Sequence, residues 1–70
     1  MTDTKTLKDK IRAKGYKISF VAAYLGISHA SLSNKINNRT DFKSIEIAKL
    51  CDLLNIEDPA EKSDIFLVIK

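Results

Sequence analysis

Residues 18–37, with the sequence ISFVAAYLGISHASLSNKIN, constrain the fold more than any other stretch of the chain. Apolar residues recur there at the spacing of one helix face, on both sides of a glycine: Ile18, Val21, Ala22 and Leu25, then Leu32 and Ile36. Gly26 can adopt the left-handed conformation that ends a helix, and Ser28 can cap the free N–H groups of the next helix. The stretch therefore predicts two short helices joined by a tight turn, which is a helix-turn-helix.

Start and stop signals predict one helix before this pair and two after it. The expected elements are residues 4–14 with Thr2, Asp3 or Thr4 as cap and Gly15 as stop, residues 44–54, and a short helix opened by Asp58, Pro59 and Glu61. Lys17 is a poor cap for a helix that starts near residue 18, and Ser19 is a candidate cap for a slightly shortened helix. We expect one compact all-α domain of five helices over residues 1–70.

The helix over residues 44–54 is expected to present a broad buried face. That face consists of Ile45, Ile47, Ala48, Leu50, Cys51 and Leu54. Phe42 precedes the helix, and its ring is expected to tuck back into the core. Cys51 has no basic neighbour and no second cysteine, so we interpret it as a small core residue.

Composition narrows the class of protein further. One cysteine excludes an internal disulfide framework and a cysteine-based zinc site, which fits a reducing compartment. No apolar run approaches the ~18 residues that cross a bilayer, and the N-terminus is polar. We expect a cytoplasmic protein that makes no membrane contact.

Charge is divided unevenly along the sequence. Residues 1–43 hold nine Lys and Arg against three Asp and Glu, whereas residues 44–70 hold three against six. A basic half suits a polyanionic partner, although a solvated lysine-rich helix explains the first helix equally well. The basic half also contains the helix-turn-helix, and this coincidence favours nucleic acid.

Catalysis is the least favoured class of function. His29 is the only histidine, and no second base or metal ligand stands at a recognisable spacing from it. No glycine-rich phosphate-binding loop is present either. We therefore expect neither enzymatic activity nor a metal or cofactor.

The second helix of the pair has an outward strip suited to reading DNA. With Leu32 and Ile36 inward, the strip consists of Ala30, Ser33, Asn34 and Asn37. Asn34 can pair with adenine, Ala30 can touch a thymine methyl, and His29 can bond to a base edge. Candidates for phosphate contact are Ser28, Ser31, Lys35, Asn37, Asn38 and Arg39. Simpler roles remain open, because Ser28 can be only a cap, the two asparagines only helix terminators, and Lys35 only a solvated charge.

The motif Ala22-x3-Gly26-Ile27-Ser28-x3-Leu32-Ser33 resembles the helix-turn-helix of the Cro/CI-type, or XRE-like, phage repressors. The continuation Ser31-Leu32-Ser33-Asn34-Lys35-Ile36-Asn37-Asn38, then Phe42, then Glu46-Ile47-x2-Leu50-Cys51-x2-Leu54-Asn55-Ile56, is similar to small regulators of that group. The resemblance implies a lambda-repressor-like domain that regulates transcription by binding palindromic operators as a dimer, with its third helix, residues 29–37, in the major groove. By position, His29, Ala30, Ser33 and Asn34 match base-reading places and Asn37 a phosphate-contacting one. Lys17 and Ile18 replace the usual Thr-Gln, so a phosphate contact there falls to Lys17.

DNA binding does not explain two apolar features of the sequence. Phe20 and Tyr24 point away from the core face of their helix, with Tyr16 at the same interval before them. The chain ends in an apolar run that includes Phe66, Leu67, Val68 and Ile69, which packs on its own core, forms a strand or meets another subunit. The run either folds over Phe20 and Tyr24, or these residues form a partner surface. Residues 63–70 are the expected dimer contact, and the rival function is an antirepressor that binds another phage repressor.

Overall fold

The computed structural model describes residues 1–67 and contains five helices in the expected order. They are α1 (Thr4–Ala13), α2 (Ile18–Leu25), α3 (His29–Ile36), α4 (Ser44–Leu54) and α5 (Pro59–Phe66). No strand occurs within this range. The prediction of an all-α, five-helix fold is confirmed.

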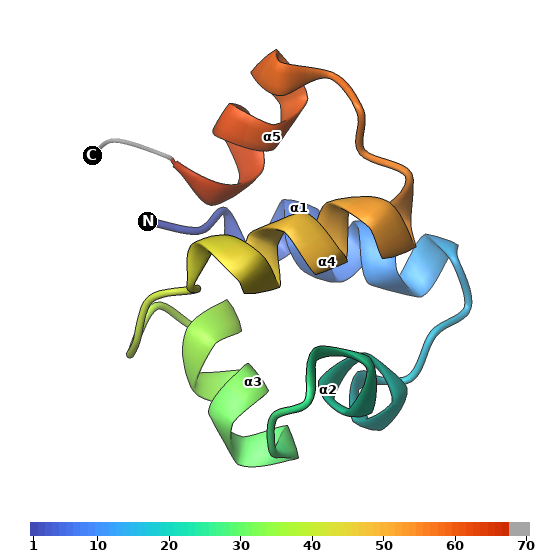
Figure 1. The fold of residues 1–70 in the computed structure, drawn as a ribbon, viewed down its shortest axis with the longest axis vertical. Coiled ribbons are helices and arrows are strands. Elements are labelled where there is room, and N and C mark those ends of the chain that lie inside the picture. Colours follow the sequence, from blue (N-terminus) through green and yellow to red (C-terminus); the bar gives the residue numbers. More distant parts are fainter. Residues whose placement is uncertain (68–70) are drawn as a thin grey trace.

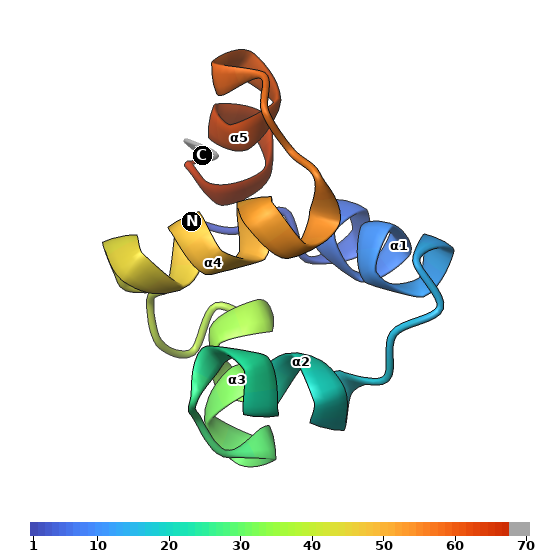
Figure 2. The same ribbon diagram turned by 45° about the vertical axis from the view of Figure 1, so that its right-hand side comes forward.

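Helices α1 and α4 cross the middle of the molecule, with α2 and α3 on one side and α5 on the other (Figures 1 and 2). Helix α2 contacts both α3 and α4, and α1 contacts both α3 and α5. The core between them is formed by Leu7, Ile11, Val21, Ala22, Leu25, Leu32, Ile36, Leu50, Cys51, Leu54, Ile56, Ile65 and Phe66. Helix α3 is therefore held from behind by α1 and α2.

Local sequence signals set most of the helix ends. Asp3 accepts a hydrogen bond from the Thr6 N–H at 3.1 Å, and Asp58 accepts one from Ala60 at 3.0 Å, as their N-cap roles predict. Gly26 has φ of +73°, the left-handed conformation expected of it. The prediction for Ser19 is wrong: α2 begins at Ile18, Lys17 occupies the N-cap position, and no side chain caps the helix.

The buried face of α4 is narrower than predicted. Ile45 is 65% exposed and Ala48 is also exposed, because the inward stripe follows residues 46, 50 and 54 at four-residue spacing. Glu46 takes the buried place instead, at 5% exposed. Cys51 is buried as expected, and this burial raises the pKa of its thiol. It remains a protonated core residue at neutral pH.

The C-terminal apolar run divides between core and surface. Phe66 is buried and stacks edge-on against Phe42 with ring centroids 5.7 Å apart, which confirms the inward position of Phe42. Ile65 is buried beside the N-terminal segment, where its carbonyl accepts from Asp3 N at 2.6 Å. Leu67 is 60% exposed.

These positions correct two predictions about the run. Phe66 is unavailable as a partner contact because it belongs to the core. It also does not cover Phe20 and Tyr24, because α5 and α2 lie on opposite sides of α4 (Figures 1 and 2). Val68 and Ile69 lie outside the described residues.

Candidate nucleic-acid interface

A tight turn fixes α3 against α2. Gly26 N–H bonds to the Ala23 carbonyl at 3.1 Å, and Ile27 N–H bonds to the Ala22 carbonyl at 3.0 Å, which closes the end of α2. The Ile27 side chain is partly buried against the core. Ser28 then starts α3, and its Oγ accepts from Ser31 N–H at 3.0 Å. Ser28 thus has the structural role of a cap.

The predicted strip of α3 lies on its solvent side. Leu32 and Ile36 are buried, so the opposite side of the helix faces outward. His29, Ala30 and Asn37 are exposed, and Ser33 and Asn34 are half-buried. Short side chains along this face leave the helix backbone free to approach a surface closely.

The amides on this strip differ in how far they are already engaged. Asn37 Nδ2 donates to the Ser33 carbonyl at 3.0 Å and lies 3.4 Å from the Ser33 hydroxyl. No hydrogen bond to the Asn34 side chain occurs within residues 1–67. Asn34 therefore has donor and acceptor groups available to a partner.

Lys35 does not belong to this surface. It is 8% exposed, and its Nζ lies 2.8 Å from Glu46 Oε1 and 3.3 Å from the Asp41 carbonyl oxygen. The prediction of a phosphate contact is wrong, because an ion pair with α4 draws the side chain inward. The reading as a solvated charge is wrong for the same reason.

Glu46 is charged in this pair. Burial by itself raises the pKa of its carboxyl, but hydrogen bonds from Lys35 Nζ and Lys43 N–H, with the charge of Lys35, outweigh burial and hold the pKa below its ordinary value. The bond from Lys43 N–H is 2.8 Å long and also caps the start of α4. One carboxylate thus ties α3 to α4 and stabilises the first turn of α4.

Asn38 is also engaged inside the protein. Its backbone is left-handed, with φ of +63°. Asn38 therefore terminates the helical segment, which is the simpler role considered for it in the sequence. Its side chain accepts from Thr2 N at 2.7 Å and donates to Thr2 O at 2.9 Å. The predicted phosphate contact is wrong, since the amide holds the N-terminal segment in place.

Two of the residues predicted to contact phosphates lie at the two ends of the helix pair, with their charged groups unpaired within the described residues. Lys17 precedes α2 and Arg39 follows α3, and both are exposed. Neither forms an ion pair within residues 1–67. Ser31 is half-buried beside the cap.

Sequence reasoning missed one residue at this face. A hollow of about 150 Å³ lies between α1 and α3 and is lined by Lys8, Ile18, His29, Ser33, Ile36 and Asn37. Lys8 belongs to α1 and stands out in the sequence only as one of several lysines on that helix. Its place beside α3 depends on how the two helices pack, which no local pattern encodes.

A second exposed face on α2 has different chemistry. Phe20 is 48% exposed and Tyr24 is 42% exposed, although both are large aromatic residues. The ring of Phe20 lies 5.1 Å from that of Tyr16 and 6.5 Å from that of Tyr24, measured between centroids. We call Tyr16, Phe20 and Tyr24 the aromatic row.

Residues 1–67 contain no group of three or more His, Cys, Asp or Glu side chains placed to hold a metal ion. Within the same range, no helix has the length and apolar character needed to cross a bilayer.

A comparison with protein-family models identifies a family for this chain. A family model described as "Protein of unknown function (DUF739)" matches residues 1–67. No curated protein sequence matches the chain. Because the matched range covers nearly all of the 70 residues, the chain belongs to the DUF739 family.

Proposed function

We propose that this protein is a sequence-specific DNA-binding regulator of transcription that places α3 in the major groove. The observation that carries the proposal is the outward strip of α3. It combines short exposed side chains with an unengaged amide at Asn34, on a helix fixed by a tight turn, a cap and a buried ion pair. A rigid helix with short polar side chains is what direct reading of base edges requires.

The residues of the proposed interface divide into those that contact bases and those that contact phosphates. His29, Ala30, Ser33 and Asn34 read base edges, with Asn34 forming the paired contact to adenine. Lys17, Arg39 and Asn37 contact phosphates and set the position of the protein on the duplex. Lys35 and Asn38 leave the set predicted from the sequence because their side chains are engaged inside the protein. Ser28 and Ser31 remain proposed phosphate contacts.

The regulator acts as a homodimer on a palindromic operator, as the resemblance to phage repressors implies. One recognition helix reads only a few base pairs, so two copies are needed for useful specificity. Leu67, exposed at the end of α5, begins the proposed dimer contact. Sedimentation of the full chain and of Leu67→Lys tests this assignment, and an unchanged monomer–dimer equilibrium contradicts it. The proposed setting is the cytoplasm of a bacterial host.

A salt titration of DNA binding tests the function itself. A duplex selected from a random-sequence pool serves as ligand, and an unselected duplex of the same length serves as the reference. We expect affinity for both to fall steeply with salt and the selected duplex to bind more tightly. Binding that is absent, or indifferent to salt, contradicts the proposal.

The aromatic row favours a second candidate, an antirepressor that keeps the fold and binds another repressor. Two half-exposed aromatic rings beside each other are typical of a protein contact. An apolar contact of this kind depends little on salt, so the same titration with a repressor as ligand separates the two functions. Substitution of Phe20 by lysine lowers affinity in the second case only.

A further inference from the structure

Helix α1 carries a cationic edge that faces the same side as the recognition strip. Lys8 lines the hollow between α1 and α3 together with His29, Ser33 and Asn37, which lie one turn apart along α3. Any ligand that covers this edge of α3 therefore meets Lys8 as well. The hollow joins residues that stand more than twenty positions apart in the sequence.

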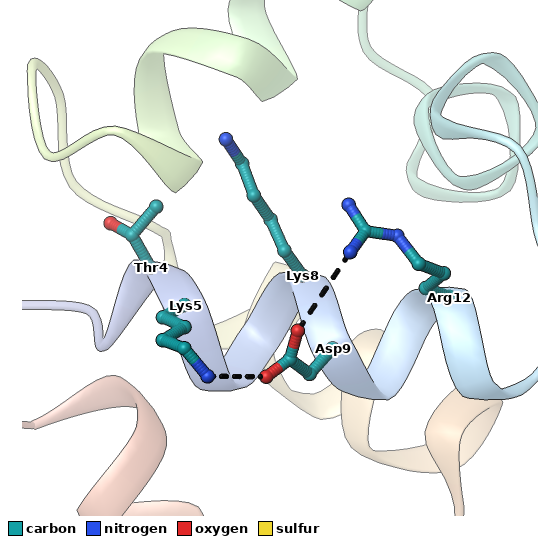
Figure 3. A pocket seen from close by; sticks show the side chains of 5 residues that line it. All are labelled: Thr4, Lys5, Lys8, Asp9 and Arg12. Atoms are coloured by element: carbon teal, nitrogen blue, oxygen red, sulfur yellow. Dashed lines mark hydrogen bonds and ion pairs between the residues drawn. The ribbon is translucent and has the colours of Figure 1, made fainter.

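Arg12 continues this edge one turn further along α1. It lines a neighbouring hollow of about 290 Å³ with Lys8, Ile11, Tyr16 and Ile18. Figure 3 shows the Lys8 and Arg12 side chains leaving the same side of α1, toward α3 and α2. The two cations thus border both helices of the helix-turn-helix.

The charges on α1 differ in whether they are already paired. Lys5 Nζ lies 3.1 Å from Asp9 Oδ2, and Lys10 pairs with Glu61 of α5 (Figure 3 shows the first pair). Arg12 lies 3.9 Å from Asp9 and is largely exposed, so that pair holds it weakly. Lys8 is exposed and forms no ion pair within residues 1–67.

We propose that Lys8 and Arg12 bind phosphates of the DNA strand that borders the major groove on the α1 side of α3. This inference rests on the proposed function and adds a third phosphate-binding element to the two ends of the helix pair. Phosphates line both edges of a groove, so a helix lying in it has phosphates along each flank. Lys8 supplies a point charge, and Arg12 supplies a planar group that binds two phosphate oxygens at once.

The experiment measures the salt dependence of DNA affinity for charge-matched variants. Lys8→Gln and Arg12→Gln each remove one charge from the proposed edge. Lys10→Gln removes one charge from the α5 side of the same helix and is the control. Each protein is titrated at several salt concentrations against the selected duplex and the unselected duplex. Circular dichroism melting verifies that the variants are folded.

We expect Lys8→Gln and Arg12→Gln each to reduce the slope of log affinity against log salt by about 0.9, the value for one phosphate contact on duplex DNA. Affinity should fall on both duplexes alike, so their ratio stays constant. Lys10→Gln should leave the slope unchanged.

Equal slopes for Lys8→Gln and Lys10→Gln overturn this inference and leave the proposed function standing. A changed ratio between the two duplexes also overturns it, because Lys8 then reads bases. Failure of the unmodified protein to bind either duplex removes the proposed function and this inference together.

Discussion

The outward faces of α2 and α3 have opposite chemistry, although a single tight turn joins the two helices. The α3 face carries short polar side chains such as Ser33 and Asn34, whereas the α2 face carries Phe20 and Tyr24 of the aromatic row. Burial of apolar surface stabilises a fold, so exposed rings on a domain this small contribute less than they could. A polar face suits a charged and hydrated groove, and an aromatic face suits a dry protein contact. We therefore propose that the two helices meet different partners.

The largest expected effect comes from breaking the ion pair that holds the polar face in place. Lys35→Ala leaves Glu46 charged and buried without its partner, so the free energy of unfolding should fall by about 3–5 kcal/mol. Denaturant melts measure this loss. Lys49→Ala, a solvent-exposed change on α4, is the control and should cost less than about 0.5 kcal/mol.

The pH dependence of stability tests the contribution of the Glu46 carboxylate to the same ion pair. The pKa of Glu46 in the folded protein lies below its ordinary value of 4.5. The contribution of the charged form is therefore complete above that value and is lost as pH falls through the lowered pKa. Glu46→Gln should flatten the acid limb of a stability curve, and an unchanged limb contradicts the assignment.

The ion pair also shows where sequence reasoning succeeds and where it fails. Gly26, Ser28 and Asp58 could be assigned correctly because a cap or a turn depends on neighbours within a few residues. The cap of α1 could be narrowed only to three candidates, of which Asp3 is the observed one. These signals, with apolar spacing, were enough to predict the five helices and the orientation of α3.

Residues with distant partners could not be assigned in this way. Lys35 has its partner eleven positions away, and Asn38 bonds to a residue thirty-six positions away. Both look like ordinary surface residues in the sequence, and so does Lys8. Their roles follow from packing of helices that local patterns do not relate.

Asn34→Ala tests whether the polar face of α3 reads bases. Loss of a paired contact to adenine should cost about 1–3 kcal/mol on the preferred duplex and relax the base preference at one position. Competition against single-base variants of the duplex measures this change. Asn37→Ala is the matched control and should weaken binding to all sequences equally; a base preference altered by Asn37→Ala instead would reverse the two roles.

Ser28→Ala tests the start of the polar face. The Oγ of Ser28 caps α3, so its removal should lower the free energy of unfolding by about 1 kcal/mol. Thermal melting measures the loss, and Ser28→Asn should restore most of it because asparagine also caps well. If Ser28→Asn restored stability but not DNA affinity, the Ser28 hydroxyl would contact a phosphate in addition to capping α3.

The smallest effect on DNA binding is expected from substitutions in the aromatic row. Phe20→Ser removes a ring that is 48% exposed, so stability should fall by only about 1 kcal/mol. If α2 faces a protein and α3 faces DNA, the variant binds duplexes with unchanged affinity and unchanged salt slope. Ala23→Ser, an exposed change on the same helix, controls for a new hydroxyl group. A loss of DNA affinity in Phe20→Ser alone would mean that the aromatic row lies against the duplex, and the two faces would then serve one partner.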